Sequence, residues 1–250
     1  MTIPRPMPQG VAEAQPVTRH HPTEPTRRYH ALWLDRFGAI QETEREAPAT
    51  PLFEAAHSAF VRGTLVNTPR GPLAVEDLLP GDKVLSESHG PLAVLWVGSM
   101  TMHPEDPPGP ARKLTRIMAD AFGIDRPVSD LMTGPGARLL SRPRHLRDRL
   151  GSDHVLTPPH AMADGHGAVC ITPRQPVTLY HLCLRRHAVI CVNGLQAESF
   201  HPGTGLDRAL DAGQLRRFLS LFPHLRELRD FGPLAHLRLP LDAPETLDLA

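Results

Sequence analysis

The chain has 250 residues, a length that suits one domain or one domain with tails. Its 27 basic and 27 acidic residues cancel, so no overall charge draws it to nucleic acid or to an anionic membrane. Hydrophobic residues make up 40%, which permits a globular core. The 28 prolines, about twice the usual share, favour short strands and irregular connections over long helices.

The sequence carries no signal for a membrane span, a signal peptide or a cofactor. No apolar run reaches the roughly 18 residues of a transmembrane helix, and prolines interrupt the N-terminal stretch where a signal peptide would have its apolar core. Cytoplasmic localisation is therefore the default expectation. Nucleotide-binding glycine motifs are absent, and the spacing of His154, His160 and His166 does not fit a zinc site, so we expect no cofactor and no metal.

Composition divides the chain into four parts. Residues 1–28 hold six prolines and few large apolar groups, so we expect a disordered arm. Residues 29–57 are predicted to be a short β and linker segment, with a charged, proline-bounded linker over 42–51. The main domain spans residues 58–200, and a C-terminal extension follows over 201–250.

The extension is predicted to contain one short helix. Asp207 or Asp211 can cap it, Leu219 is its last residue, and Pro223 stops it. A last strand over 237–239 and a loose tail over 240–250 complete the extension.

The main domain opens with short strands separated by turns. The β-rich run from Gly63 to Thr68 ends at Pro69-Arg70-Gly71, where proline fixes φ and glycine accepts a positive φ. Two further strands, over 83–86 and 92–97, flank His89-Gly90 as a hairpin. A predicted strand over 114–122 precedes the second half.

Three blocks of this domain resemble the Hint domain, the hedgehog/intein autoprocessing module. G-T-L-V-N-T-P-R-G at 63–71, V-E-D-L at 75–78 and P-G-D-K-V-L at 80–85 match its opening block in order, and most resemble the bacterial branch that stands alone. The third block matches at Tyr180, Leu182, His187, Val189, Gly194, Glu198, Ser199 and Phe200. The resemblance implies an all-β fold, horseshoe-like and pseudo-symmetric, with the short helix outside it.

The resemblance also implies a lost nucleophile. Self-cleaving Hint domains carry Cys, Ser or Thr four residues before the G-T, where it attacks the preceding carbonyl in an acyl shift. That position is Ala59, and a methyl group cannot attack. Ser58 lies one residue early, which points its side chain the other way on an extended segment.

The second block, which supplies a proton-donating His in self-cleaving relatives, fits in two registers. In the first, D-L-M-T-G-P-G-A-R-L-L at 130–140 replaces the family's motif, so Gly134 stands for its Ser and Ala137 for its His. In the second, Thr157-Pro158-Pro159-His160 supplies the motif literally. We favour the first, because its flanking matches are denser. It predicts that Ala59 and Ala137 face one another in the former cleft near His187.

The third block lacks the His-Asn pair with which inteins release the chain, since Glu198-Ser199 stands there. We interpret His187 as structural and Asn193 as a turn residue. The strands on either side of Arg185-Arg186 are expected to pair with each other. A basic cluster at Arg138, Arg142, Arg144, Arg147 and Arg149 is interpreted as a solvated loop face, or as a surface for an acidic partner.

These inferences favour a Hint-domain protein that has lost self-cleavage and acts as a structural or interaction module for a protein partner not readable from the sequence. The alternative is autocatalytic peptide-bond cleavage with substitutes: Ser58 or Thr64 as nucleophile, His160 or His187 as acid and base. A third reading, an amide hydrolase acting on other chains, would need a catalytic triad, and the sequence offers no clear one.

Overall fold

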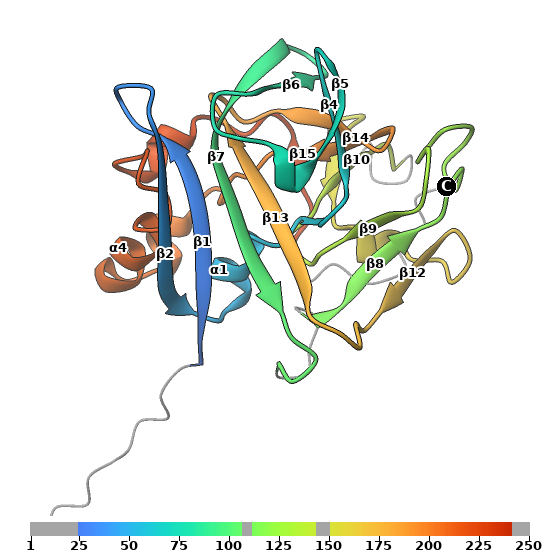
Figure 1. Ribbon diagram of the computed structural model, residues 1–250. Helices are drawn as coiled ribbons and strands as arrows, with labels where there is room; N and C mark the ends of the chain where they lie inside the picture. The colour runs from blue at the N-terminus through green and yellow to red at the C-terminus, as the bar shows by residue number, and fades with distance from the viewer. Residues whose placement is uncertain (1–24, 107–111, 144–150, 242–250) are drawn as a thin grey trace, which may run out of the picture.

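The computed structural model describes residues 25–106, 112–143 and 151–241. Within these ranges the chain forms one 16-stranded sheet (Figure 1). The long strand β7 (Gly90–Met102) is shared by its two parts, because its first residues pair with β6 (Lys83–Ser86) and its later residues pair with β1 (Thr26–Leu34) and β13 (Val177–Leu184). The all-β fold predicted from the resemblance is confirmed.

The first part of the sheet has the order β12-β8-β9-β3-β13-β7-β1-β2. Its remaining strands are β2 (Ile40–Pro48), β3 (Phe60–Val61), β8 (Leu114–Ile117), β9 (Leu131–Thr133) and β12 (Ala168–Ile171). The second part runs β7-β6-β14-β15-β10-β11-β16, with β4 paired to β14 and β5 to β4. Its strands are β4 (Leu65–Thr68), β5 (Gly71–Ala74), β10 (Leu139–Ser141), β11 (Val155–Thr157), β14 (Val189–Val192), β15 (Leu195–Glu198) and β16 (Leu237–Arg238).

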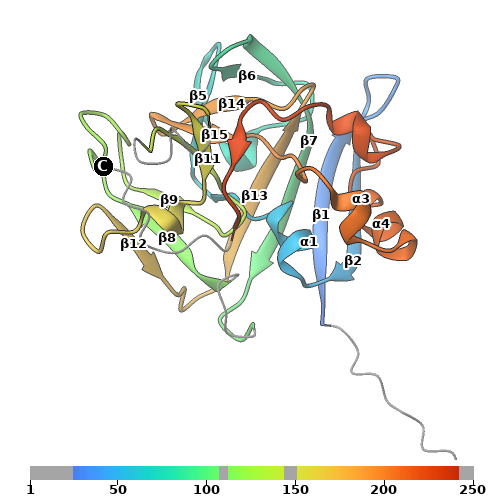
Figure 2. The same cartoon turned by 180° about the vertical axis from the view of Figure 1, so that it is seen from behind.

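Short helices cover one face of the β1–β2 hairpin, as seen from behind in Figure 2. They are α1 (Pro51–Ala55), α3 (Leu206–Ala209) and α4 (Ala212–Leu219); the 3-10 turns are η1 (Val75–Asp77), η4 (Pro159–Met162) and η5 (Leu228–Phe231). The predicted helix is confirmed at α4. Asp211 caps it by accepting hydrogen bonds from the N–H groups of Gly213 and Gln214, and the Gln214 side chain accepts from the Asp211 N–H. No helix in the described ranges is long and apolar enough to cross a membrane.

An aromatic cluster joins the N-terminal hairpin, the sheet and the C-terminal helices. At its centre, the Phe222 ring lies 5.2 Å from Phe200 and 4.7 Å from Trp96, both in the main domain. The Trp96 indole also donates a hydrogen bond to the carbonyl of Leu221. On the N-terminal side, Phe53 of α1 packs edge-to-face on Phe218 of α4. The segments that flank the main domain are therefore packed against it and against each other.

Several predictions made from the sequence are wrong at their boundaries. Residues 42–48 form most of strand β2 and not a linker. This strand lies at the sheet edge and is largely exposed on both faces as far as Glu46, so it lacks the apolar alternation of a buried strand. Strand β8 ends at Ile117 and not at 122, since the chain turns at Asp120 with φ 60. Of the predicted arm 1–28, Thr26 to Arg28 lie in β1, and residues 1–24 are outside the described ranges.

The strands on either side of Arg185-Arg186 do not pair with each other in the described sheet. Strand β13 pairs with β3 and β7, whereas β14 pairs with β4, β6 and β15. The chain therefore crosses from one part of the sheet to the other between them. Asn193-Gly194 forms the tight turn from β14 to β15, with φ of 46 and 83, as its sequence predicts.

The aromatic cluster makes a stability prediction. The variant Phe222→Ala should lower the free energy of unfolding by about 3–5 kcal/mol, because it leaves a cavity where the flanking segments meet. Urea denaturation measures this loss. The control Phe37→Ala, at a side chain that is 80% exposed, should change the free energy by less than about 0.5 kcal/mol. Equal losses in the two variants would contradict this packing.

Candidate functional site

The segment from Ala55 to Ala59, which leads from α1 into β3, lies against the loop Gly134–Ala137 that follows β9. The Gly134 N–H donates to the Ala59 carbonyl at 2.8 Å, and the Gly136 N–H donates to the Ser58 carbonyl at 3.0 Å. On the other side, the Ala59 N–H donates to the carbonyl of Tyr180 in β13 at 3.0 Å. The Ser58–Ala59 peptide group is thus held from both sides by backbone hydrogen bonds.

This approach is so close that only glycine fits at two positions of the loop. A Cβ atom at Gly134 would stand 2.1 Å from the Ser58 carbonyl oxygen. At Gly136 it would stand 2.4 Å from the Ala55 carbonyl oxygen and 2.8 Å from the Ser58 hydroxyl. Neither site tolerates a side chain without moving backbone, so the two segments meet backbone to backbone.

The two alanines singled out in the sequence lie on these touching segments. Ala59 and Ala137 are both fully buried and belong to the same apolar core cluster, with neighbours such as Val66 and Leu182. The structure thus brings together the segments that carry Ala59 and Ala137. Their role as former catalytic positions remains a prediction.

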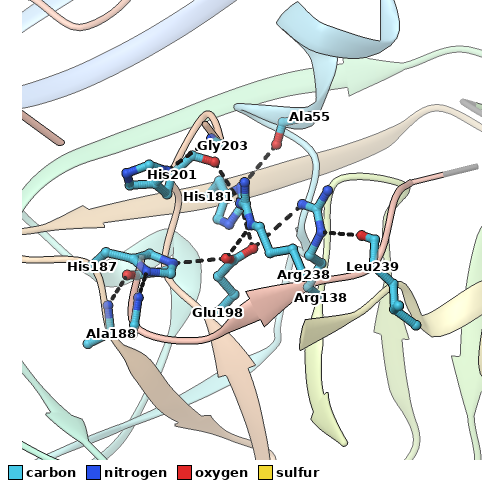
Figure 3. A network of polar contacts seen from close by, with 12 residues as sticks. Ala55, Arg138, His181, His187, Ala188, Glu198, His201, Gly203, Arg238 and Leu239 are labelled. Carbon is cyan, nitrogen blue, oxygen red and sulfur yellow. Dashed lines mark hydrogen bonds and ion pairs between the residues drawn. The ribbon is translucent and has the colours of Figure 1, made fainter. Parts of the chain in front are cut away.

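His187 belongs to a buried polar cluster that we call the Glu198 cluster: Glu198, His187, Arg138 and Arg238 (Figure 3). The His187 Nε2 donates to Glu198 Oε1 at 2.8 Å, and its Nδ1 accepts the Ala235 N–H at 2.9 Å. Both ring nitrogens are therefore occupied, and the hydrogen bonds fix the tautomer with its proton on Nε2. Held in this way, His187 has no free nitrogen for another group.

The Glu198 carboxylate has no exposed side-chain surface, and two arginines from different segments supply the positive charge beside it. Arg238 of β16 donates two hydrogen bonds to the carboxylate, from Nε to Oε1 at 2.7 Å and from Nη2 to Oε2 at 2.8 Å. The Nη1 atom of Arg138 lies 3.5 Å from Oε2 of Glu198. Burial by itself raises the pKa of Glu198, but the His187 hydrogen bond and the arginines outweigh it and lower the pKa to about 2.

The burial of Arg138 corrects the sequence interpretation of a solvated basic cluster. Its side chain is only 10% exposed, and burial lowers its pKa to about 10. It reaches Glu198 and also donates to the carbonyl of Leu239 at 3.5 Å. Of the other cluster members, Arg142 is exposed, and residues 144–150 lie outside the described ranges.

The other candidate residues contact neighbouring groups in their own parts of the structure. The Ser58 hydroxyl is buried and accepts the Gly136 N–H at 3.1 Å, and the Thr64 hydroxyl donates to the Val61 carbonyl at 2.6 Å. His160 lies on η4, which packs against β8 and β12. Its partner in the second register, Thr157, shares a 2.6 Å hydrogen bond with Ser141 of the neighbouring strand.

Two buried histidines close to the Ser58–Ala59 bond were missed in the sequence. The Nδ1 of His181 donates to the Ala55 carbonyl at 3.0 Å, and the Nδ1 of His57 donates to the Phe53 carbonyl at 3.2 Å. Within the described structure, the Nε2 of each has no hydrogen-bond partner. Burial lowers the pKa of His57 to about 3 and that of His181 to about 4, so both are neutral near pH 7. A lone buried His has no sequence signal that separates it from a surface His.

A sequence model described as the Hint domain matches residues 58–204, more than half of the chain. The chain therefore belongs to the Hint domain family.

Among solved structures, an intein-like domain from Clostridium thermocellum is similar with 15% identity and a TM-score of 0.39, over 57% of this chain and 99% of that one. A splice-inactive variant of the AceL NrdHF class 3 split intein is similar with 11% identity and a TM-score of 0.38, over 57% and 97%. The gp41-1 intein is similar with 13% identity and a TM-score of 0.34, over 57% and 99%. No curated protein matches by sequence.

The Glu198 cluster predicts how stability depends on one arginine and on pH. The variant Arg238→Met should lower the free energy of unfolding by about 3–5 kcal/mol at pH 7, because it leaves the buried carboxylate without its main counter-charge. The exposed control Arg217→Met should have almost no effect. Urea titrations over a range of pH measure both variants.

The sign of the pH effect follows from the lowered pKa of Glu198. A carboxyl group with a folded pKa below its unfolded value, about 4.3, stabilises the protein above that value and loses this effect as the pH falls. The difference between the wild type and Arg238→Met should therefore shrink between about pH 5 and pH 2. A difference that stays constant over this range would contradict the pairing.

Proposed function

We propose that this Hint-domain protein does not cleave itself and acts as a structural or interaction module that binds another protein. The observation that carries the proposal is the contact of Gly134 and Gly136 with the Ala55–Ala59 segment. In the favoured register Gly134 stands at the position of the motif's Ser, and its contact with the Ser58 carbonyl leaves no room for a side chain there. Ala59 stands at the nucleophile position and Ala137 at the histidine position, and both are packed as apolar core.

Acid–base groups near the Ser58–Ala59 bond are also unsuited to cleavage. A general acid must carry a proton that it can give to the leaving nitrogen near working pH. His57 and His181 are neutral, and each Nδ1 proton is directed to a backbone carbonyl. His187 is held between Glu198 and the Ala235 N–H. These contacts support the proposed loss of self-cleavage.

The alternative, cleavage with substitute residues, receives less support. Ser58 would have to give up the hydrogen bond from Gly136, and Thr64 would have to release the Val61 carbonyl. Within the part of the chain that the structure describes, neither hydroxyl is hydrogen-bonded to a histidine that would activate it.

The flanking segments favour a permanent assembly over release of a fragment. Strand β1 pairs with β7 from His30 to Trp33, and Arg27 forms an ion pair with Asp106 of the main domain at 2.6 Å. On the other flank, Arg238 and Ala235 bind the Glu198 cluster. Even with the bond after Ser58 cut, these contacts would keep the N-terminal segment in place. Such an architecture suits a module that stays whole and presents its surface to a partner.

Intact mass of the purified chain tests the proposal. After incubation with and without DTT, we expect one unchanged mass, since no side chain is placed to attack the Ser58 carbonyl. A break at residue 58 that disappears in Ser58→Ala or His160→Ala would establish the alternative and overturn the proposal.

A repair experiment separates the loss of two side chains from the loss of the space for them. The double variant Ala59→Cys with Ala137→His restores both groups, yet we expect no cleavage in DTT. Because residue 137 is fully buried, the larger ring should also lower the free energy of unfolding by about 1–3 kcal/mol through overpacking. The single variant Ala59→Cys is the matched control. Cleavage after Ser58 in the double variant only would contradict the filled-cleft account.

A further inference from the structure

We propose that the free edge of strand β2 binds an extended, basic segment of a partner protein as an added antiparallel strand. The inference rests on the proposed interaction module and names the chemistry of its partner. Within the described ranges β2 pairs only with β1, so it ends the first part of the sheet. Its nine residues are long for an edge strand, and the figures place it on the outside of the molecule (Figure 1).

The register shows which backbone groups of β2 are unpaired by β1. Just beyond the two ends of the β1–β2 ladder, in the same register, Asp35 is hydrogen-bonded to Ala39 at 2.9 Å and Ala49 to Pro25 at 2.7 Å. In an antiparallel pair hydrogen-bonded positions alternate. The odd-numbered residues of β2 therefore face β1 with their N–H and C=O groups. The outward groups belong to Ile40, Glu42, Glu44 and Glu46.

The same four residues determine which partner fits. Their side chains share one face of the strand, since strand side chains alternate. Glu42, Glu44 and Glu46 place three carboxylates at alternate positions, and the Glu42 and Glu44 side chains are 70% and 58% exposed. Ile40, 46% exposed, follows at the next such position. An antiparallel strand would therefore match with basic residues at three alternate positions and then an apolar residue.

A second copy of this chain does not fit this edge. Antiparallel pairing of two β2 strands centred on Glu44 would place Glu42 opposite Glu46 and Glu44 opposite Glu44. Like charges directly opposite each other destabilise a strand pair. The acidic row thus disfavours self-association and leaves the edge open to a basic strand.

The carboxylates already have neighbours on β1, but these contacts do not block a partner. His30 lies 2.7 Å from Glu42, and Arg28 lies 3.6 Å from Glu44. Thr26 hydrogen-bonds Glu46. Exposed ion pairs of this kind contribute little, typically about 0–1 kcal/mol, and a carboxylate accepts several hydrogen bonds. A basic strand on the open side would share these oxygens.

The test uses the full chain and the synthetic peptide KTRTKTI, whose basic residues would stand opposite Glu46, Glu44 and Glu42. Saturating peptide should slow amide hydrogen exchange at Ile40, Glu42, Glu44 and Glu46 by at least about tenfold and leave Gln41, Thr43 and Arg45 unchanged. This alternation is the signature of strand addition, and attraction of charge alone does not produce it.

Two matched controls make the test decisive. The variant Glu44→Lys should weaken peptide binding at least about tenfold, by placing like charges opposite each other. The variant Asp77→Lys changes the net charge equally on η1, outside β1 and β2, and should bind like the wild type. The same peptide, N-methylated at its second and third basic residues, keeps its charge but loses two backbone donors, so it should not protect the edge.

Three outcomes would overturn the proposal: no binding at about 1 mM peptide, equal binding of the N-methylated peptide, or equal weakening by Asp77→Lys and Glu44→Lys. None of these outcomes bears on self-cleavage. The intact-mass experiment can therefore fail or succeed independently of this one.

Discussion

A single buried carboxylate organises this molecule. Glu198 ends β15 with no exposed side-chain surface, and a buried charge is tolerated only when it is paired. Its partners come from distant parts of the chain: Arg138 precedes β10, His187 precedes β14, and Arg238 lies in β16 of the C-terminal extension. By requiring all three, Glu198 fixes the extension onto the main domain. It also binds Nε2 of His187, while the Ala235 N–H binds Nδ1.

The contact between the Gly134–Ala137 loop and the Ala55–Ala59 segment depends on the same arrangement. Arg138, directly after the loop, accepts the Glu198 N–H at its carbonyl and points its guanidinium at the carboxylate. The loop is thereby anchored at its end, and its glycines meet the backbone of Ser58 and Ala55 without space for a side chain. Arg138 thus links the contact between the loop and the Ala55–Ala59 segment to the Glu198 cluster.

The all-β fold was predicted from the resemblance of three sequence blocks to the Hint domain, and several turns between the strands were predicted because turns are local signals. Pro80-Gly81-Asp82 and Asn193-Gly194 mark chain reversals wherever they occur. Strand β2 was missed because an edge strand exposed on both faces has no apolar alternation. The ion pair between Glu198 and Arg238 was missed for another reason. The two residues lie 40 positions apart, and a long-range ion pair leaves no local pattern in the sequence. Sequence reasoning placed Ala59 and Ala137 on touching segments, but the backbone contact that fills the space depends on tertiary structure.

The most direct test of the central claim is the hydrogen-exchange rate of the Gly134 and Gly136 amides, whose acceptors are the carbonyls of Ala59 and Ser58. If the space is permanently closed, both amides should exchange as slowly as the paired amides of β13, with opening free energies near that of global unfolding. If instead they exchange as fast as exposed loop amides while β13 stays protected, the loop opens in the native protein. The account of a filled cleft would then be wrong.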